Sequence, residues 1–216
     1  INATLGIIGR PIDKLQLGLS FATPTVFQLT ENYDASMVAN WKNHIYWDGK
    51  NLNDQEAFTD VLTSSYALRT PYRLSGGAAY IMKKGFISGD IELTNPASSK
   101  YSSSTPGLDF DVDNADIKTF YAKSVVNYRV GGEYRHQDYR FRAGYGYQSN
   151  SLNSFGYNNA IHNVSAGVGI RKSTYFIDLT LINSSGKNYY FPYTTASDVT
   201  LRSSLTRVVF TLGFIL

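Results

Sequence analysis

The stretch Asn127–Gln148, NYRVGGEYRHQDYRFRAGYGYQ, decides the fold class of this chain. Its first half places apolar residues such as Tyr128 and Val130 at alternate positions, with polar residues such as Arg129 between them. Its second half repeats this two-residue period after a short polar break at His136–Asp138. Because successive side chains of a strand point to opposite faces, the stretch predicts two antiparallel strands joined by a tight turn.

The same period recurs along most of the chain. About nine segments of roughly ten residues alternate in this way, and each is predicted to form a strand. A single turn of helix around Asp54–Leu62 is the one competing helical pattern. The predicted strands are 2–10, 15–29, 66–82, 86–95, 120–135, 139–149, 161–171, 175–183 and 204–216.

The connections between these strands alternate in length. Short turns are expected at Pro11–Lys14, Lys83–Gly85, His136–Asp138 and Lys172–Thr174. Long loops are expected at 30–65, 96–119, 150–160 and 184–203. A β-sandwich gives no reason for such alternation, whereas a transmembrane β-barrel has short periplasmic turns at one rim and long extracellular loops at the other. The fold class predicted is therefore all-β, an antiparallel transmembrane β-barrel of the bacterial outer membrane.

Composition excludes several other classes of protein. Charged residues make up 17% of the chain and aromatic residues 14%, which argues against a disordered segment. There is no Cys, so neither a disulfide scaffold nor a Cys-based zinc site is possible. No apolar run is long enough for a transmembrane helix. The net charge of +3 is small, so nucleic acid is not an expected partner.

The polar registers of the predicted strands carry most of the charged residues. Seven arginines and four carboxylates are expected to face the lumen of the barrel as a polar network. They either brace neighbouring strands or contact a plug or a permeating solute. This set comprises Arg73, Asp90, Glu92, Arg129, Glu133, Arg135, Arg140, Arg142, Arg171, Asp178 and Arg207.

The opposite register is apolar and is expected to contact outer-membrane lipid. In the last strand Arg207 is predicted to point inward. Tyrosines near the strand ends, such as Tyr128 and Tyr147, are expected to form the aromatic girdles at the two membrane interfaces. The lipid-facing residues predicted for the last strand are Val208, Phe210, Leu212 and Phe214.

Five of these segments, in this order, resemble the FadL-type family of outer-membrane transporters for long-chain fatty acids and other hydrophobic compounds. The composition, which is low in charged residues and rich in Asn and Tyr, resembles that of the branch found in Bacteroidetes-type bacteria. The resemblance covers most of the strands and few of the loops. The segments are Leu15–Pro24 (LQLGLSFATP), Tyr72–Tyr80 (YRLSGGAAY), Lys84–Leu93 (KGFISGDIEL), Tyr128–Arg135 (YRVGGEYR) and Phe141–Gln148 (FRAGYGYQ).

The resemblance implies a barrel of 14 strands with an N-terminal hatch inside it. Residues 1–216 would then form the C-terminal part of one barrel domain. The expected partner of this part is the N-terminal part of the same barrel, with the hatch and early strands that are absent from this chain. The implied function is passive transport of hydrophobic or amphipathic small molecules such as long-chain fatty acids. The alternatives are a general diffusion porin, or a surface or secretion-partner barrel that binds protein cargo.

In the family, the loop that corresponds to 30–65 helps to form a hydrophobic groove that first captures the substrate. Here this loop is rich in apolar side chains and contains both tryptophans of the chain. These side chains either line such a groove or pack the loop onto itself above the barrel mouth. The residues expected to bind substrate are Trp41, Tyr46, Trp47, Phe58 and Leu62.

No motif indicates an enzyme, a cofactor or a metal site. The three histidines, His44, His136 and His162, fall in a loop, a turn and a strand start, so the pattern brings no catalytic triad together. The run Asp109–Asp116 begins like a calcium loop but has Asn114 and Phe120 where Gly and Glu are required. It is predicted to be a solvated acidic loop.

Overall fold

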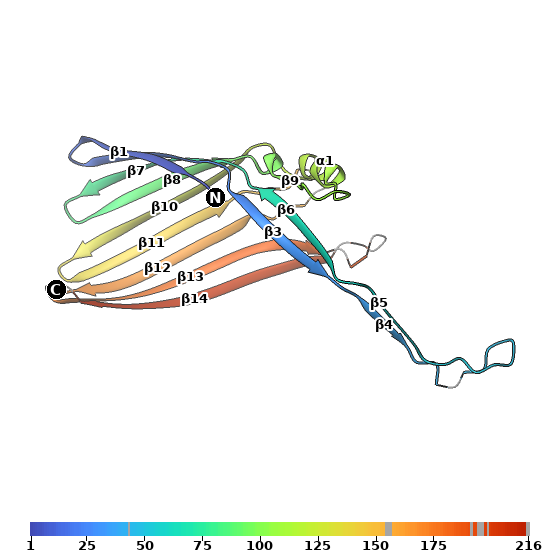
Figure 1. The fold of residues 1–216 in the computed structure, drawn as a ribbon. Helices are drawn as coiled ribbons and strands as arrows, with labels where there is room; N and C mark the ends of the chain where they lie inside the picture. The colour runs from blue at the N-terminus through green and yellow to red at the C-terminus, as the bar shows by residue number, and fades with distance from the viewer. Residues whose placement is uncertain (43, 154–156, 191, 194–196, 198, 215–216) are drawn as a thin grey trace.

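A computed structural model describes residues 1–42, 44–153, 157–190, 192–193, 197 and 199–214. Its main element is a curved antiparallel sheet of nine strands, in which sequence neighbours pair throughout except where β2 pairs with β7 and β8 with β10 (Figure 1). In spatial order these strands are β1 (Thr4–Ile12), β2 (Leu15–Ala22), β7 (Arg73–Met82), β8 (Gly85–Thr94), β10 (Val125–His136), β11 (Tyr139–Gln148), β12 (Ile161–Arg171), β13 (Tyr175–Tyr190) and β14 (Val199–Phe214).

The short turns all lie at one end of this sheet. The hairpins β1–β2, β7–β8, β10–β11 and β12–β13 close there, and β14 ends at the same rim (Figure 1). The longer connections lie at the opposite end, together with Tyr101 and Tyr190. The predicted alternation of a short-turn rim with a long-loop rim is therefore confirmed.

The pairing register places the two kinds of side chain on opposite faces. On the last two strands Leu181 is opposite Val208 and Leu179 is opposite Phe210, whereas Asp178 pairs with Thr211. The apolar residues of β7, β8, β10, β11 and β12 continue the first of these faces. The predicted register of the final strand is confirmed for Val208–Phe214, and residues 215–216 lie outside the described residues.

The described residues contain almost no hydrophobic core. The buried apolar residues are Ala97, Val125 and Ala160, and no large side chain is fully buried. In contrast, the apolar face of the main sheet is exposed from β1 to β14, and Phe210 retains 65% of its accessible surface. A sheet with this distribution is suited to an apolar surrounding medium rather than to water.

Two predicted strands are each divided by a proline. The predicted strand 15–29 is β2 and β3 (Val26–Tyr33), separated at Pro24, and the predicted strand 66–82 is β6 (Leu62–Arg69) and β7, separated at Pro71. Proline cannot donate a hydrogen bond to a strand ladder, so the pairing changes at both positions. β3 pairs with β6, and β6 also pairs with β9 (Lys100–Ser102).

The segment 30–65 is a β-ribbon rather than the loop predicted. β3 and β6 continue outward into β4 (Ser36–Ala39) and β5 (Gln55–Phe58), which pair with each other. We call residues 26–69 the arm. It projects away from the main sheet at the long-loop end (Figure 1). The helical turn predicted around Asp54–Leu62 is wrong, because β5 occupies that position.

Two further predictions about the long loops are wrong. Most of the predicted loop 184–203 belongs to β13 and β14, which pair without a break from Tyr175–Phe214 to Tyr190–Val199. The predicted long loop 96–119 contains the 3-10 helix η1 (Pro96–Ser98), β9 and the helix α1 (Asp111–Phe120), and α1 includes most of the run Asp109–Asp116 that was predicted as an acidic loop. Asp111 and Asp113 lie in the first turn of α1, where carboxylates stabilise the helix dipole. No helix among the described residues is long and apolar enough to cross a membrane.

Candidate functional site

The charged residues gather on the concave face of the sheet. Strand pairing places all eleven residues of the predicted network on one face; for example Asp90 lies opposite Arg129, and Glu133 lies opposite Arg142. Two open hollows of about 580 and 940 Å³ are lined largely by residues of this face. We therefore call it the inner face, and the apolar face the outer face.

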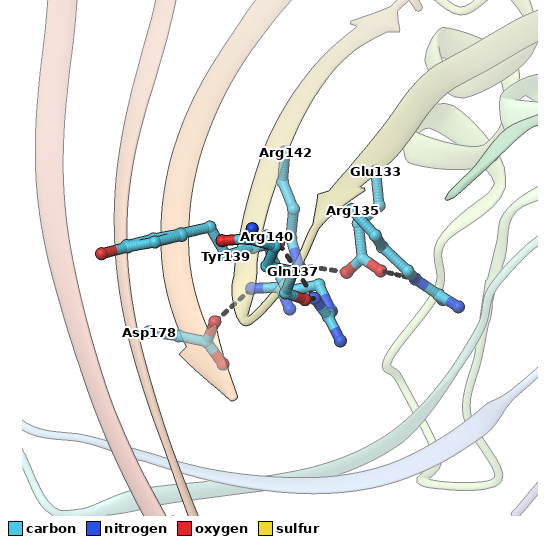
Figure 2. A network of polar contacts seen from close by, with 7 residues as sticks. All are labelled: Glu133, Arg135, Gln137, Tyr139, Arg140, Arg142 and Asp178. Atoms are coloured by element: carbon cyan, nitrogen blue, oxygen red, sulfur yellow. Dashed lines mark hydrogen bonds and ion pairs between the residues drawn. The ribbon is translucent and has the colours of Figure 1, made fainter. Parts of the chain in front are cut away.

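Glu133 is the centre of the largest ion-pair network. Its carboxylate accepts hydrogen bonds from Arg135 Nε at 2.6 Å and from Arg142 Nε at 2.7 Å (Figure 2). Arg142 also donates through Nη1 to Asp178, so the network joins β10, β11 and β13 across β12. Only 10% of the Glu133 side chain is exposed. Arg140, which faces Arg135 across the strand pair, donates to the carbonyls of Gln137 and Tyr139 instead.

Substituting Glu133 is expected to reduce stability. In Glu133→Gln the two arginines lose their shared carboxylate, at a cost on the order of 1–3 kcal/mol. Urea unfolding of the assembled protein measures the loss. Glu92→Gln is the matched control, because the same charge is removed from the same face, but among the described residues Glu92 accepts a hydrogen bond from Asn127 alone, at 3.1 Å. Equal midpoints for the two variants would contradict a bracing role for the network.

The rest of the predicted inner set is more loosely held. Asp90 accepts from Arg129 Nε at 2.9 Å, and the Arg171 guanidinium lies 5.6 Å from the centre of the Phe176 ring. Arg73 and Arg207 take part in no ion pair among the described residues. The inner set thus combines a braced cluster near the short-turn rim with cations that form no ion pair within the part of the chain that the structure describes.

The smaller hollow is more polar than the charged set alone suggests. Arg207, Arg129 and Glu92 line it together with uncharged polar residues that are not among the predicted site residues. The two-residue period places these residues on the inner face, although they carry no charge that would mark them. These additional residues are Asn127, Gln148, Asn163 and Ser165.

The five residues predicted to bind substrate lie along the arm. Tyr46 and Trp47 contact each other near its tip, with ring centres 5.6 Å apart, and Trp47 is 87% exposed. Trp41 is close in the chain, and its backbone N–H donates to Asp54 at 2.9 Å. Phe58 ends β5 and Leu62 begins β6, further from the tip. None of the five lines either hollow described above, so capture of a ligand by these residues stays a prediction.

The residues weighed for chemistry remain apart. His44 is on the arm, His136 ends β10, and His162 lies on the outer face, where the Tyr145 hydroxyl is 2.8 Å from its Nδ1. Asp111, Asp113 and Asp116 lie on α1. Among the described residues no group of three or more His, Asp and Glu side chains is placed to hold a metal ion.

An ion pair also joins two of the short turns. Lys172 donates to Asp138, and this contact raises the pKa of the Lys172 ammonium above its ordinary value. The backbone N–H of Arg171 donates to the Asp138 carbonyl at 2.8 Å, which holds the turns together further. The short-turn rim is thereby braced between neighbouring hairpins.

One of the comparisons with known proteins supports the fold. No protein-family model matches the chain, and no curated protein sequence matches it. The crystal structure of the P. putida toluene transporter TodX is similar, with a TM-score of 0.51 and 17% sequence identity. The similarity covers 98% of this chain and 47% of that one, so this chain spans about half the length of TodX. The predicted all-β fold is confirmed: the nine-stranded sheet has the architecture of part of an outer-membrane β-barrel.

Proposed function

We propose that the protein is a passive transporter in the bacterial outer membrane. The observation that carries this proposal is the division of the curved sheet into a continuous apolar outer face and a charged inner face. Lipid favours the first face and a solute pathway the second. The similarity in fold to a toluene transporter supports the same role.

The substrates we propose are hydrophobic or amphipathic small molecules such as long-chain fatty acids. The FadL-like segments of the sequence and the fold shared with TodX support this class. The arm presents apolar side chains to the outside, and each methylene moved from water to an apolar surface gains about 0.8 kcal/mol. Trp41, Tyr46 and Trp47 form its aromatic tip and give a loose first contact for an alkyl chain.

We further propose that residues 1–216 form the C-terminal part of a single barrel domain. β1 and β14 are the two edge strands of the nine-stranded sheet that the structure describes, and this supports the proposal. An open sheet edge in lipid would leave main-chain groups without hydrogen-bond partners. Strands from the N-terminal part of the same barrel would then complete the wall, and its hatch would lie inside.

The substrate class is tested by removing the two tryptophans from the arm of the full-length protein. The double variant Trp41→Ser, Trp47→Ser is expected to bind and import oleate at least about tenfold more weakly, because most of the apolar area at the tip is lost. The matched control, Trp41→Phe with Trp47→Phe, keeps an aromatic surface and is expected to retain most uptake. Unchanged uptake in the folded Ser variant would exclude capture by the arm.

A general diffusion porin is the second candidate, favoured by the polar residues that line the smaller hollow. A porin conducts ions across a planar bilayer and shows no saturable binding of fatty acid. A transporter of hydrophobic compounds shows the reverse. Measuring both properties on the same preparation separates these two functions.

A further inference from the structure

The hairpin β13–β14 carries its own change of polarity on the outer face. Going toward the long-loop rim, the apolar pairs end at Leu181 and Val208. The next two outward pairs are Asn183 with Thr206 and Ser185 with Ser204. The Asn183 amide donates to Thr206 at 2.9 Å and to Ser204 at 3.1 Å, which confirms that these side chains share a face.

The following outward pair is Lys187 with Arg202, directly opposite each other in register. Two like charges in this position destabilise a strand pair when nothing lies between them. The outward positions of β12, β13 and β14 contain no Asp or Glu. Neither cation takes part in an ion pair among the described residues. Among the described residues, therefore, no carboxylate is paired with either cation.

The outward side chains around this pair follow the same order of polarity as a lipid molecule, from a charged headgroup through polar groups to apolar chains. Below it are hydroxyl and amide groups, then the apolar band of Leu179, Leu181, Val208 and Phe210. His162, paired with Ser185 on the neighbouring strand, contacts the rings of Tyr145 and Tyr147. Such aromatic groups sit at the headgroup level of a membrane.

We propose that Lys187 and Arg202 bind the phosphate of an anionic lipid of the outer leaflet, whose acyl chains cover the apolar band below. The inference rests on the proposed position in the outer membrane. Arginine and lysine both pair strongly with phosphate oxygens, and their long stems let the charged heads reach the headgroup level. A phosphate between the two side chains removes the repulsion within the pair.

The test measures lipid retained by the detergent-purified full-length protein, with native mass spectrometry as the readout. The probes are diphosphoryl lipid A and the same lipid without its phosphates. Lys187→Gln with Arg202→Gln is expected to weaken retention of the phosphorylated lipid by about fivefold for each cation removed. The matched control is Arg171→Gln with Arg207→Gln, which removes two charges from the inner face of β12 and β14 and is expected to retain the lipid.

Equal retention by the outer-face variant and the wild type, or equal retention of the two lipids by the wild type, would overturn the proposal. Excess inorganic phosphate that displaces the lipid completely would also do so, because the acyl chains would then contribute nothing. The outer-face variant is expected to fold and to import oleate normally. If the wild-type protein retains the phosphorylated lipid but does not transport oleate, the result contradicts the proposed function and not the lipid site.

Discussion

Phe210→Arg is expected to block assembly, whereas Thr211→Arg is expected to leave the protein folded. Phe210 faces outward opposite Leu179, within the apolar band. An arginine near the middle of the lipid-facing band costs about 2–4 kcal/mol. Thr211 lies opposite Asp178 on the inner face, where a new guanidinium meets a carboxylate and a polar environment.

The two variants are compared in the same lipid vesicles. The folded fraction is read from the heat-dependent shift in electrophoretic mobility, and stability from the urea midpoint. Because the two positions are adjacent on β14, they share the same depth and the same strand partners. Equal losses in the two variants would mean that the faces of β14 are assigned incorrectly.

Gly85→Ala is expected to destabilise the sheet by about 2–4 kcal/mol, from backbone strain together with steric overlap. Gly85 opens β8 with a φ of 151°, a conformation that residues with a side chain rarely adopt. A Cβ atom there would overlap the backbone carbonyl oxygen of Glu133 on the paired strand β10. A backbone atom in a ladder cannot move aside without breaking the pairing of Gly85 with Tyr134.

Gly76→Ala is the control for the same change on the neighbouring strand β7. A Cβ atom at Gly76 meets only the end of the Leu19 side chain, at 3.9 Å, which is an ordinary contact. Its urea midpoint is therefore expected to stay close to that of the wild type. A small effect at Gly85 would show that β8 begins elsewhere in the assembled barrel.

The two-residue period predicted the main sheet well because only one face of each strand contacts an apolar medium. The period identified β11 and β12 to within one residue of their bounds, whereas β10 begins at Val125, after the predicted start at residue 120. The period failed for the half of β13 and β14 nearest the long-loop rim, where Asn188 and other polar residues interrupt the alternation. Beyond the apolar band β13 has polar residues on both faces, and on β14 the apolar residues Leu201 and Leu205 lie on the inner face instead. The pairing there is held by the backbone ladder.

The site was predicted unevenly for a related reason. The inner network was predicted because charge and alternation both identify its members. The arm was predicted as a loop because Trp41, Tyr46 and Trp47 lie at its tip without a repeating pattern. The breaks at Pro24 and Pro71 do not show in the hydrophobic pattern, because apolar residues continue on both sides of each proline. Helix α1 was missed because its mixed polar sequence contains only a weak helical period.

One row of register partners crosses the boundary of the apolar band. The row begins at Ile91 on β8 and ends at Ser204 on β14, passing through Tyr128, Tyr147, His162 and Ser185. A row that starts in lipid and leaves it means that the strands lean relative to the membrane normal, as those of closed barrels do by about 35–45°. Residues at equal membrane depth are therefore not register partners, and each strand toward β14 meets the lipid headgroups nearer to its short-turn end.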